Sequence, residues 1–147
     1  GGGSNILVTK NFEGYLIKNE ISGIHIIEET EDSVIVEVGA GEIWHEFVIY
    51  CLSKKWYGLE NLSLIPGTVG ASPIQNIGAY GVEAKDYFSS VEFYQISKNK
   101  LITYTTDDCK FGYRESVFKH DLKGDFVITS VRYKLDSVRW EYNLQAH

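Results

Sequence analysis

Short apolar runs of extended type fill the first third of the chain. Each run is bounded by Gly, Asn or acidic residues, which is the usual signature of strands between turns. In the last run Val34, Val36 and Val38 face one way and Ser33, Ile35 and Glu37 face the other, as in a strand with one buried face. The predicted strands cover residues 6–8, 15–17, 24–27 and 33–38.

The hydrophobic period then changes from two residues to that of a helix. Apolar side chains recur at helical spacing, with acidic residues near the start and Lys54 and Lys55 at the end, an arrangement that suits the helix dipole. We therefore predict an amphipathic helix over residues 43–54. Further strands are predicted at 91–96, 101–105 and 126–135. Together these elements indicate an α+β fold with a mixed or antiparallel sheet and flanking helices.

Residues 61–82 form a 22-residue segment without any charged side chain. They contain both prolines of the chain, Pro66 and Pro73, and four of its 14 glycines. Pro and Gly at this density exclude a helix through most of the segment. A solvated loop normally carries charge, so we expect this one to be irregular and shielded. Its backbone polar groups then need partners, which either a bound polar ligand or neighbouring protein can supply.

The composition limits the classes of function that the chain can serve. It has 147 residues, the size of one domain, with 14 basic and 20 acidic residues and a net charge of −6. A binder of the nucleic-acid backbone would show a clustered basic excess, so nucleic acid is not expected as a partner. No apolar run approaches the ~18 residues of a membrane span, and no signal-peptide pattern is present. Cys51 and Cys109 lie far apart, which indicates two buried, reduced thiols.

Two glycine-rich stretches are candidate ligand turns. Residues 1–5 can cradle a phosphate with converging N–H groups, or they can be a flexible linker, and composition alone leaves both readings open. Residues 39–42 stand between a predicted strand and the predicted helix, where backbone can approach a ligand closely. Trp44 occupies the place of the third glycine of a GxGxxG motif, which argues against a dinucleotide-binding Rossmann unit.

Among the polar residues, Arg114 is the strongest candidate for chemistry. It lies between Tyr113 and Glu115, and it can be either a surface arginine in an ion pair or a guanidinium fork for a carboxylate or phosphate. His45 lies beside the apolar stripe of the helix and is expected to be structural. The sequence shows neither a Ser/His/Asp or Cys/His constellation nor a carboxylate cluster with metal-ligand spacing, so no metal is expected.

Four motifs occur in an order and at spacings that carry a specific resemblance. The chain resembles the UDP-N-acetylenolpyruvoylglucosamine reductase family, also called UDP-N-acetylmuramate dehydrogenases, from residue 1 to about Leu135. The resemblance implies that residues 1–5 are native sequence. It also implies an FAD-binding domain of the vanillyl-alcohol-oxidase type over residues 1–135 that lacks the N-terminal lobe, with a divergent tail at 136–147. The motifs are GGGSNIL, GAGEIWHEFV, GLENLSLIPGTVGASPIQNIGAYGVE and DCKFGYRESVFK.

The resemblance also implies an activity and a set of site residues. The family reduces a UDP-sugar enolpyruvyl ether with NADPH through bound FAD, in cytoplasmic synthesis of peptidoglycan precursors. Arg114 matches the active-site arginine of its GYR motif, and Tyr142 stands several residues from the place of a substrate-gripping tyrosine in one subclass. The family's catalytic Ser and Glu lie in a C-terminal domain beyond His147. The positions that match its flavin-facing segments are Gly2, Gly3, Ser4, Asn5, Gly70, Ser72, Pro73, Ile74, Gln75, Asn76, Ile77 and Gly78.

Three functional hypotheses follow. The first is the flavin-binding part of such a reductase, inactive as an isolated fragment and exposing apolar surface that a partner chain or self-association would cover. The second is a non-catalytic flavin-binding module or a decayed relative. The third, a carbohydrate-binding β-protein, suits the 14% aromatic content but leaves the uncharged segment unexplained.

Overall fold

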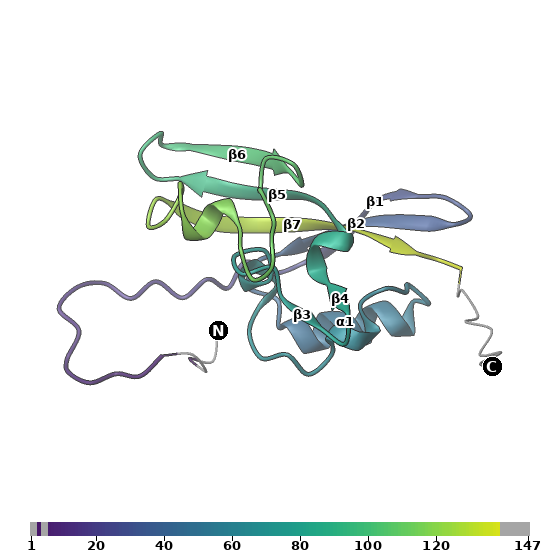
Figure 1. Ribbon diagram of the computed structural model, residues 1–147, viewed down its shortest axis with the longest axis horizontal. Coiled ribbons are helices and arrows are strands. Elements are labelled where there is room, and N and C mark those ends of the chain that lie inside the picture. The colour runs from purple at the N-terminus through teal and green to yellow at the C-terminus, as the bar shows by residue number, and fades with distance from the viewer. Residues whose placement is uncertain (1–2, 4–5, 139–147) are drawn as a thin grey trace.

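A computed structural model describes residue 3 and residues 6–138 (Figure 1). The larger sheet contains five strands in the order β1-β2-β7-β5-β6, and β3 pairs with β4 in a small separate hairpin. The elements are β1 Ile24–Glu29, β2 Ser33–Gly39, α1 Trp44–Ser53, β3 Gly78–Ala79, β4 Val82–Glu83, β5 Phe88–Gln95, β6 Lys100–Thr105 and β7 Phe126–Asp136, with 3-10 turns η1 Glu60–Leu62, η2 Val69–Ala71, η3 Ala84–Asp86 and η4 Val117–Lys119.

Every strand pair of the larger sheet is antiparallel, and β7 lies at its centre. Val131 of β7 is paired with Val38 of β2 on one side and with Val91 of β5 on the other. The strands predicted at 24–27, 33–38, 91–96, 101–105 and 126–135 are all confirmed, with ends that differ by a few residues. The predicted α+β class with an antiparallel sheet is confirmed as well.

The core lies between one face of the sheet and α1. Val34, Val36 and Val38 are fully buried, so the alternation in the sequence identifies the covered face correctly. Figure 1 shows α1 and the β3–β4 hairpin on the same side of the sheet. The rings of Trp44 and Phe47 from α1 pack against Tyr133 of β7, with centroids 6.0 and 5.0 Å away.

The predicted helix is confirmed, and its C-terminus has a specific structure. The Trp56 N–H donates to the Cys51 carbonyl at 2.9 Å and the Lys55 N–H donates to the Leu52 carbonyl at 3.0 Å, which together form a Schellman motif. Lys55 has φ +60, the left-handed conformation that this motif requires. The chain therefore turns sharply after α1 and leads directly into the uncharged segment.

The strands predicted at residues 6–8 and 15–17 are wrong. Residues 6–22, the arm, contain no helix or strand, and Leu7 and Tyr15 are 86% and 96% exposed. Apolar runs become strands only when backbone partners are available, and within the described part of the chain residues 6–17 have no ladder partner. Figure 1 shows the arm extending away from the body.

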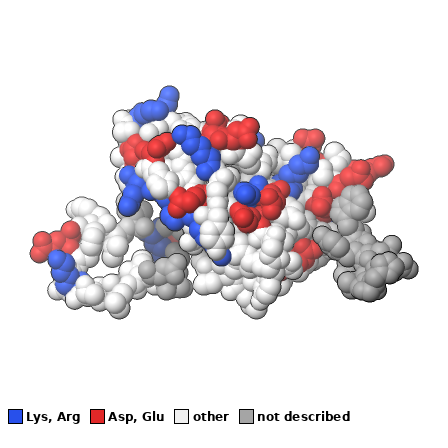
Figure 2. Space-filling view, viewed as in Figure 1, with Lys and Arg blue, Asp and Glu red and all other residues white. Residues whose placement is uncertain are grey.

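Charge is distributed unevenly over the surface. On the sheet face opposite the core, Arg132 donates to Glu37 at 2.7 Å and Thr129 donates to Glu92 at 2.7 Å. Figure 2 shows acidic and basic side chains interspersed over the upper part of the body, whereas its lower part in this view is almost uncharged. Among the described residues, no helix is long and apolar enough to span a membrane.

Candidate functional site

Residues 61–82, the uncharged loop, are irregular and mostly shielded, as the sequence predicts. Apart from two 3-10 turns and the two-residue strands β3 and β4, the loop has no regular structure. Six of its 22 residues are exposed, namely Asn61, Leu64, Pro66, Gln75, Tyr80 and Gly81. Neighbouring protein shields the loop, and a cavity borders part of it.

Backbone hydrogen bonds dock the uncharged loop against the turn at residues 39–42. The Val69 N–H donates to the Glu42 carbonyl at 2.9 Å, and the Gly70 N–H donates to the Ala40 carbonyl at 2.9 Å. A Cβ atom at Gly70 would lie 2.7 Å from the Cβ of Ala40. Glycine is therefore required at residue 70 because the two backbones approach each other closely.

Gly41 of the 39–42 turn also allows a close backbone approach, in this case by the arm. A Cβ atom at Gly41 would lie 2.6 Å from the backbone of Glu20, so the C-terminal end of the arm passes directly over this turn. The Gly41 N–H donates to the Ile21 carbonyl at 2.7 Å. The turn thus supports both the uncharged loop and the arm, and its close backbone approaches are made to protein.

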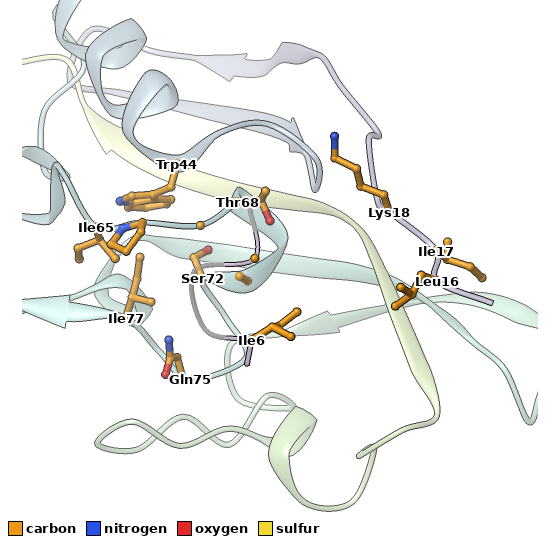
Figure 3. A pocket seen from close by; sticks show the side chains of 14 residues that line it. Ile6, Leu16, Ile17, Lys18, Trp44, Ile65, Thr68, Ser72, Gln75 and Ile77 are labelled. Atoms are coloured by element: carbon orange, nitrogen blue, oxygen red, sulfur yellow. The ribbon is translucent and has the colours of Figure 1, made fainter. Parts of the chain in front are cut away.

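A cavity of about 500 Å³ lies between the uncharged loop and the arm. Figure 3 shows Trp44, Ile65 and Ile77 on one side of it, with Leu16, Ile17 and Lys18 of the arm on the opposite side. Four of the residues predicted to bind a cofactor line the cavity: Gly3, Ser72, Gln75 and Ile77.

The sequence analysis missed several lining residues because they come from distant segments. Trp44 belongs to α1, and the sequence marks it only as the residue in place of a third glycine. Leu16 and Lys18 lie in or beside a predicted strand that does not form. Thr68 and Ala71 lie within the uncharged loop, where the absence of charge was the available signal. The lining is therefore mostly uncharged, with Lys18 as its charged side chain.

Other predicted site residues lie elsewhere. Gly70, Pro73, Ile74, Asn76 and Gly78 belong to the uncharged loop but do not line this cavity. Ser72 does line it, yet its hydroxyl is buried, donates to the Val69 carbonyl at 2.7 Å and lies 2.8 Å from the Tyr133 hydroxyl. Gly2, Ser4, Asn5 and Tyr142 lie outside the described residues.

Arg114 belongs to a tight turn that lies against the uncharged loop. Residues 112–115, the arginine turn, are closed by reciprocal backbone hydrogen bonds between Gly112 and Glu115 at 3.0 and 3.2 Å. Nη2 of Arg114 donates to the Gly78 carbonyl at 2.8 Å, one residue beyond the cavity-lining Ile77. The guanidinium therefore lies against the loop, although it does not line the cavity.

The surface ion pair considered for Arg114 is made by other residues. Glu115 pairs with Lys119 at 3.5 Å and contacts His120. The hydrogen bond from His120, with the nearby charges of His120 and Lys119, lowers the pKa of the Glu115 carboxyl. Glu115 is thus occupied, and the guanidinium of Arg114 makes no ion pair with it.

Neither a metal centre nor a reactive thiol is found in the described residues. Within residue 3 and residues 6–138, no group of three or more His, Cys, Asp or Glu side chains could hold a metal ion. Cys51 and Cys109 are free and buried, and burial raises the pKa of each thiol to about 12. His45 accepts a hydrogen bond from the Leu64 N–H at 3.1 Å, which agrees with the structural role expected for it.

Comparison with known proteins places this arrangement among flavoproteins. The model of the FAD binding domain family matches residues 1–103. UDP-N-acetylenolpyruvoylglucosamine reductase from Chromobacterium violaceum is 53% identical over 136 residues, which are 92% of this chain and 40% of that protein. The enzyme of the same name from Dechloromonas aromatica is 48% identical and covers 99% of this chain and 44% of its own length.

The fold comparison agrees with the sequence comparison. The crystal structure of UDP-N-acetylenolpyruvylglucosamine reductase from Thermus caldophilus has a TM-score of 0.59 at 31% identity, over 67% of this chain and 35% of that one. The chain thus spans about 40% of the length of the curated relatives that it matches. On its sequence and its fold, the chain belongs to the FAD binding domain family and is similar to the flavin-binding portion of the UDP-N-acetylenolpyruvoylglucosamine reductases.

Proposed function

We propose that the chain holds FAD against the uncharged loop, as the flavin-binding part of a UDP-N-acetylenolpyruvoylglucosamine reductase. The cavity between this loop and the arm is the observation that carries the proposal. Its volume of about 500 Å³ falls within the range of small-molecule sites, and its lining is mostly apolar with a few polar groups. Such a lining suits a flat aromatic ring with polar edges. The residues present therefore fit the cofactor.

Different residues of the chain bind the cofactor and act on the substrate. Bound FAD supplies hydride transfer from NADPH to the enolpyruvyl double bond. Gly3, Gln75 and Ile77 hold the cofactor from the cavity wall. Arg114 stabilises the negative charge that develops on the carboxylate of the substrate. A well-placed donor of this kind contributes about 3–4 kcal/mol of transition-state stabilisation.

The substrate and the location follow from this function. We propose the UDP-N-acetylglucosamine enolpyruvyl ether as the substrate, with UDP-N-acetylmuramate as the product, and Tyr142 as a further contact to the substrate. The location is the cytoplasm, where NADPH is available as the reductant. The alternative is a flavin-binding module without catalysis, which the 40% coverage of the relatives leaves in view.

FAD titration of the purified chain tests the proposal. Ala71 lines the cavity and Leu64 is an exposed residue of the same loop that does not, so Ala71→Phe and Leu64→Phe form a matched pair. We expect flavin fluorescence to change on binding to the wild-type chain and to the Leu64→Phe variant. Ala71→Phe should weaken binding at least tenfold because the ring fills the cavity. Thermal melts establish that both variants are folded, and equal flavin affinity in a folded Ala71→Phe variant would place the cofactor elsewhere.

A further inference from the structure

Three hydrogen bonds join the uncharged loop to the arginine turn and to Ser116, the residue that follows the turn. Arg114 Nη2 donates to the Gly78 carbonyl at 2.8 Å, and the buried Ser116 hydroxyl donates to the Ile74 carbonyl. The third bond comes from the loop itself, because Nδ2 of Asn76 donates to the Gly112 carbonyl at 2.9 Å. The position of the arginine turn is therefore set by contacts to loop residues that alternate with the cavity-lining Gln75 and Ile77.

Asn76 is the central member of this group of contacts. It is 1% exposed and has φ +43, and its Oδ1 accepts from the Lys85 N–H at 2.9 Å. Its Nδ2 also donates to a carboxylate oxygen of Glu83. An amide NH2 group has two hydrogens, and both are used here. Asn76 consequently has no donor left for a cofactor, although the resemblance places it among the cofactor-binding residues.

We propose that Asn76 is a positioning residue, which holds the Gly112 carbonyl and thereby sets the place of Arg114 relative to the cavity. This inference rests on the proposed function, in which Arg114 acts on the substrate. The reciprocal backbone bonds between Gly112 and Glu115 make the turn a small closed unit, so fixing one end fixes the other. Arg114 lies two residues from the anchored carbonyl.

The residue type at position 76 is constrained in two ways. The left-handed conformation is accessible to Asn and Asp at little cost, whereas most other side chains are strained there. Two donors and one acceptor are needed on one short side chain, and Asn supplies both while Asp supplies only acceptors. Asp thus keeps the backbone and the bond from the Lys85 N–H, and it removes only the donors.

A pair of variants separates the anchor from general stability. Asn76→Asp removes the side-chain donor to the Gly112 carbonyl, which keeps only its backbone bond from the Glu115 N–H. The same change places two carboxylates side by side. In the double variant Asn76→Asp/Glu83→Gln, the amide of residue 83 can donate to the new carboxylate, so the partly buried pair is restored with its donor reversed. The Gly112 carbonyl still lacks its side-chain donor. Glu83→Gln alone is the control, because Asn76 keeps both donors.

Nuclear magnetic resonance on the whole chain provides the readout. The sequence contains three arginines, so the Arg114 side-chain N–H signal can be assigned with an Arg114→Lys variant. We expect the double variant to melt within a few degrees of wild type, while the Glu115 amide exchanges at least tenfold faster and the Arg114 side-chain signal moves or broadens. Glu83→Gln should leave both unchanged.

Two outcomes would overturn the proposal. One is a folded double variant with wild-type exchange at Glu115 and an unchanged Arg114 signal. The other is an equal change in the Glu115 exchange rate and the Arg114 signal in Glu83→Gln, which would mean that the loss of the Glu83 carboxylate causes the effect. FAD titration of the same variants keeps this test separate from the test of the proposed function. If the wild-type chain did not bind FAD, the proposed function would fail, but the exchange measurements would still report on the role of Asn76.

Discussion

At the scale of single residues, Arg114 combines an unfavourable backbone with a well-placed side chain. Its φ of +54 lies in the left-handed region, which costs about 1–2 kcal/mol for a residue with a Cβ atom. Strain of this kind is found at functional sites where surrounding structure holds it in place. The bond to the Gly78 carbonyl and the closed arginine turn supply that support.

The guanidinium of Arg114 should be needed for turnover more than for substrate affinity. In a complete reductase that carries this sequence, we expect Arg114→Lys to lower kcat by roughly 10²–10³-fold, with a smaller rise in KM. Lysine keeps the charge but lacks the planar fork. Arg132→Lys is the control, because Arg132 bonds to Glu37 on the sheet face opposite the core. Unchanged kcat in Arg114→Lys would assign the side chain to structure alone.

The two thiols should make stability fall in alkaline solution. Burial raises the pKa of Cys51 and Cys109 to about 12, whereas an exposed thiol has a value near 9. The folded state therefore keeps its protons while the unfolded state loses them, so the stabilisation is complete below pH 9 and is lost as the pH rises towards 12. Urea unfolding at pH 8 and pH 10 measures this. Replacing both cysteines by Ala should flatten the profile, and an unchanged slope would contradict the assignment.

At the scale of elements, the local hydrophobic pattern predicts correctly those segments whose packing partners are also visible as apolar patterns in the sequence. The alternation of Val34, Val36 and Val38 identified a covered strand face because a neighbouring helix carries a matching apolar stripe. The same kind of signal misled at residues 6–8 and 15–17, where apolar runs meet no ladder partner in the described chain. Strand formation depends on distant backbone, which a local pattern does not contain.

The close docking of the uncharged loop should make Gly70 sensitive to substitution. We expect Gly70→Ala to destabilise the fold by about 1–3 kcal/mol, because the added methyl would lie 2.7 Å from the Cβ of Ala40 and one backbone must shift. Gly112→Ala is the control, since its nearest neighbour would be 3.5 Å away, and it should change stability by less than about 1 kcal/mol. Urea unfolding of both variants decides, and equal stabilities would show that the loop can move aside.

At the scale of the whole molecule, the sequence predicted the loop but only part of the cavity. A stretch of 22 residues without charge and with both prolines marks a shielded irregular segment, and the structure has one there. The opposite wall could not be predicted because Leu16 and Lys18 reach the cavity only through the course of the arm. The position of Arg114 on the outer side of the loop likewise depends on a hydrogen bond between residues 36 positions apart.

The isolated chain should not reduce UDP-N-acetylenolpyruvoylglucosamine. The cavity is bordered on one side by the arm, whose apolar side chains are largely exposed, so flavin is held firmly from the loop side only. The resemblance implies that the family's proton-donating Ser and its Glu lie beyond His147, and the chain covers 40% of the length of such a relative. General-acid catalysis contributes about 10²–10⁴-fold, and substrate positioning can contribute more.

NADPH oxidation measures this, with FAD and the enolpyruvyl substrate added and with the same mixture without substrate as the control. We expect equal rates in the two mixtures. The arm exposes the apolar side chains of Leu7, Tyr15 and Ile17, so we also expect the chain to associate with itself or with a partner chain that covers them. Sedimentation of the same sample measures the size of the species that form. Substrate-dependent turnover close to that of a complete reductase would contradict the prediction. It would mean that a proton donor lies within these 147 residues, and the side chains that line the cavity would be the first to substitute.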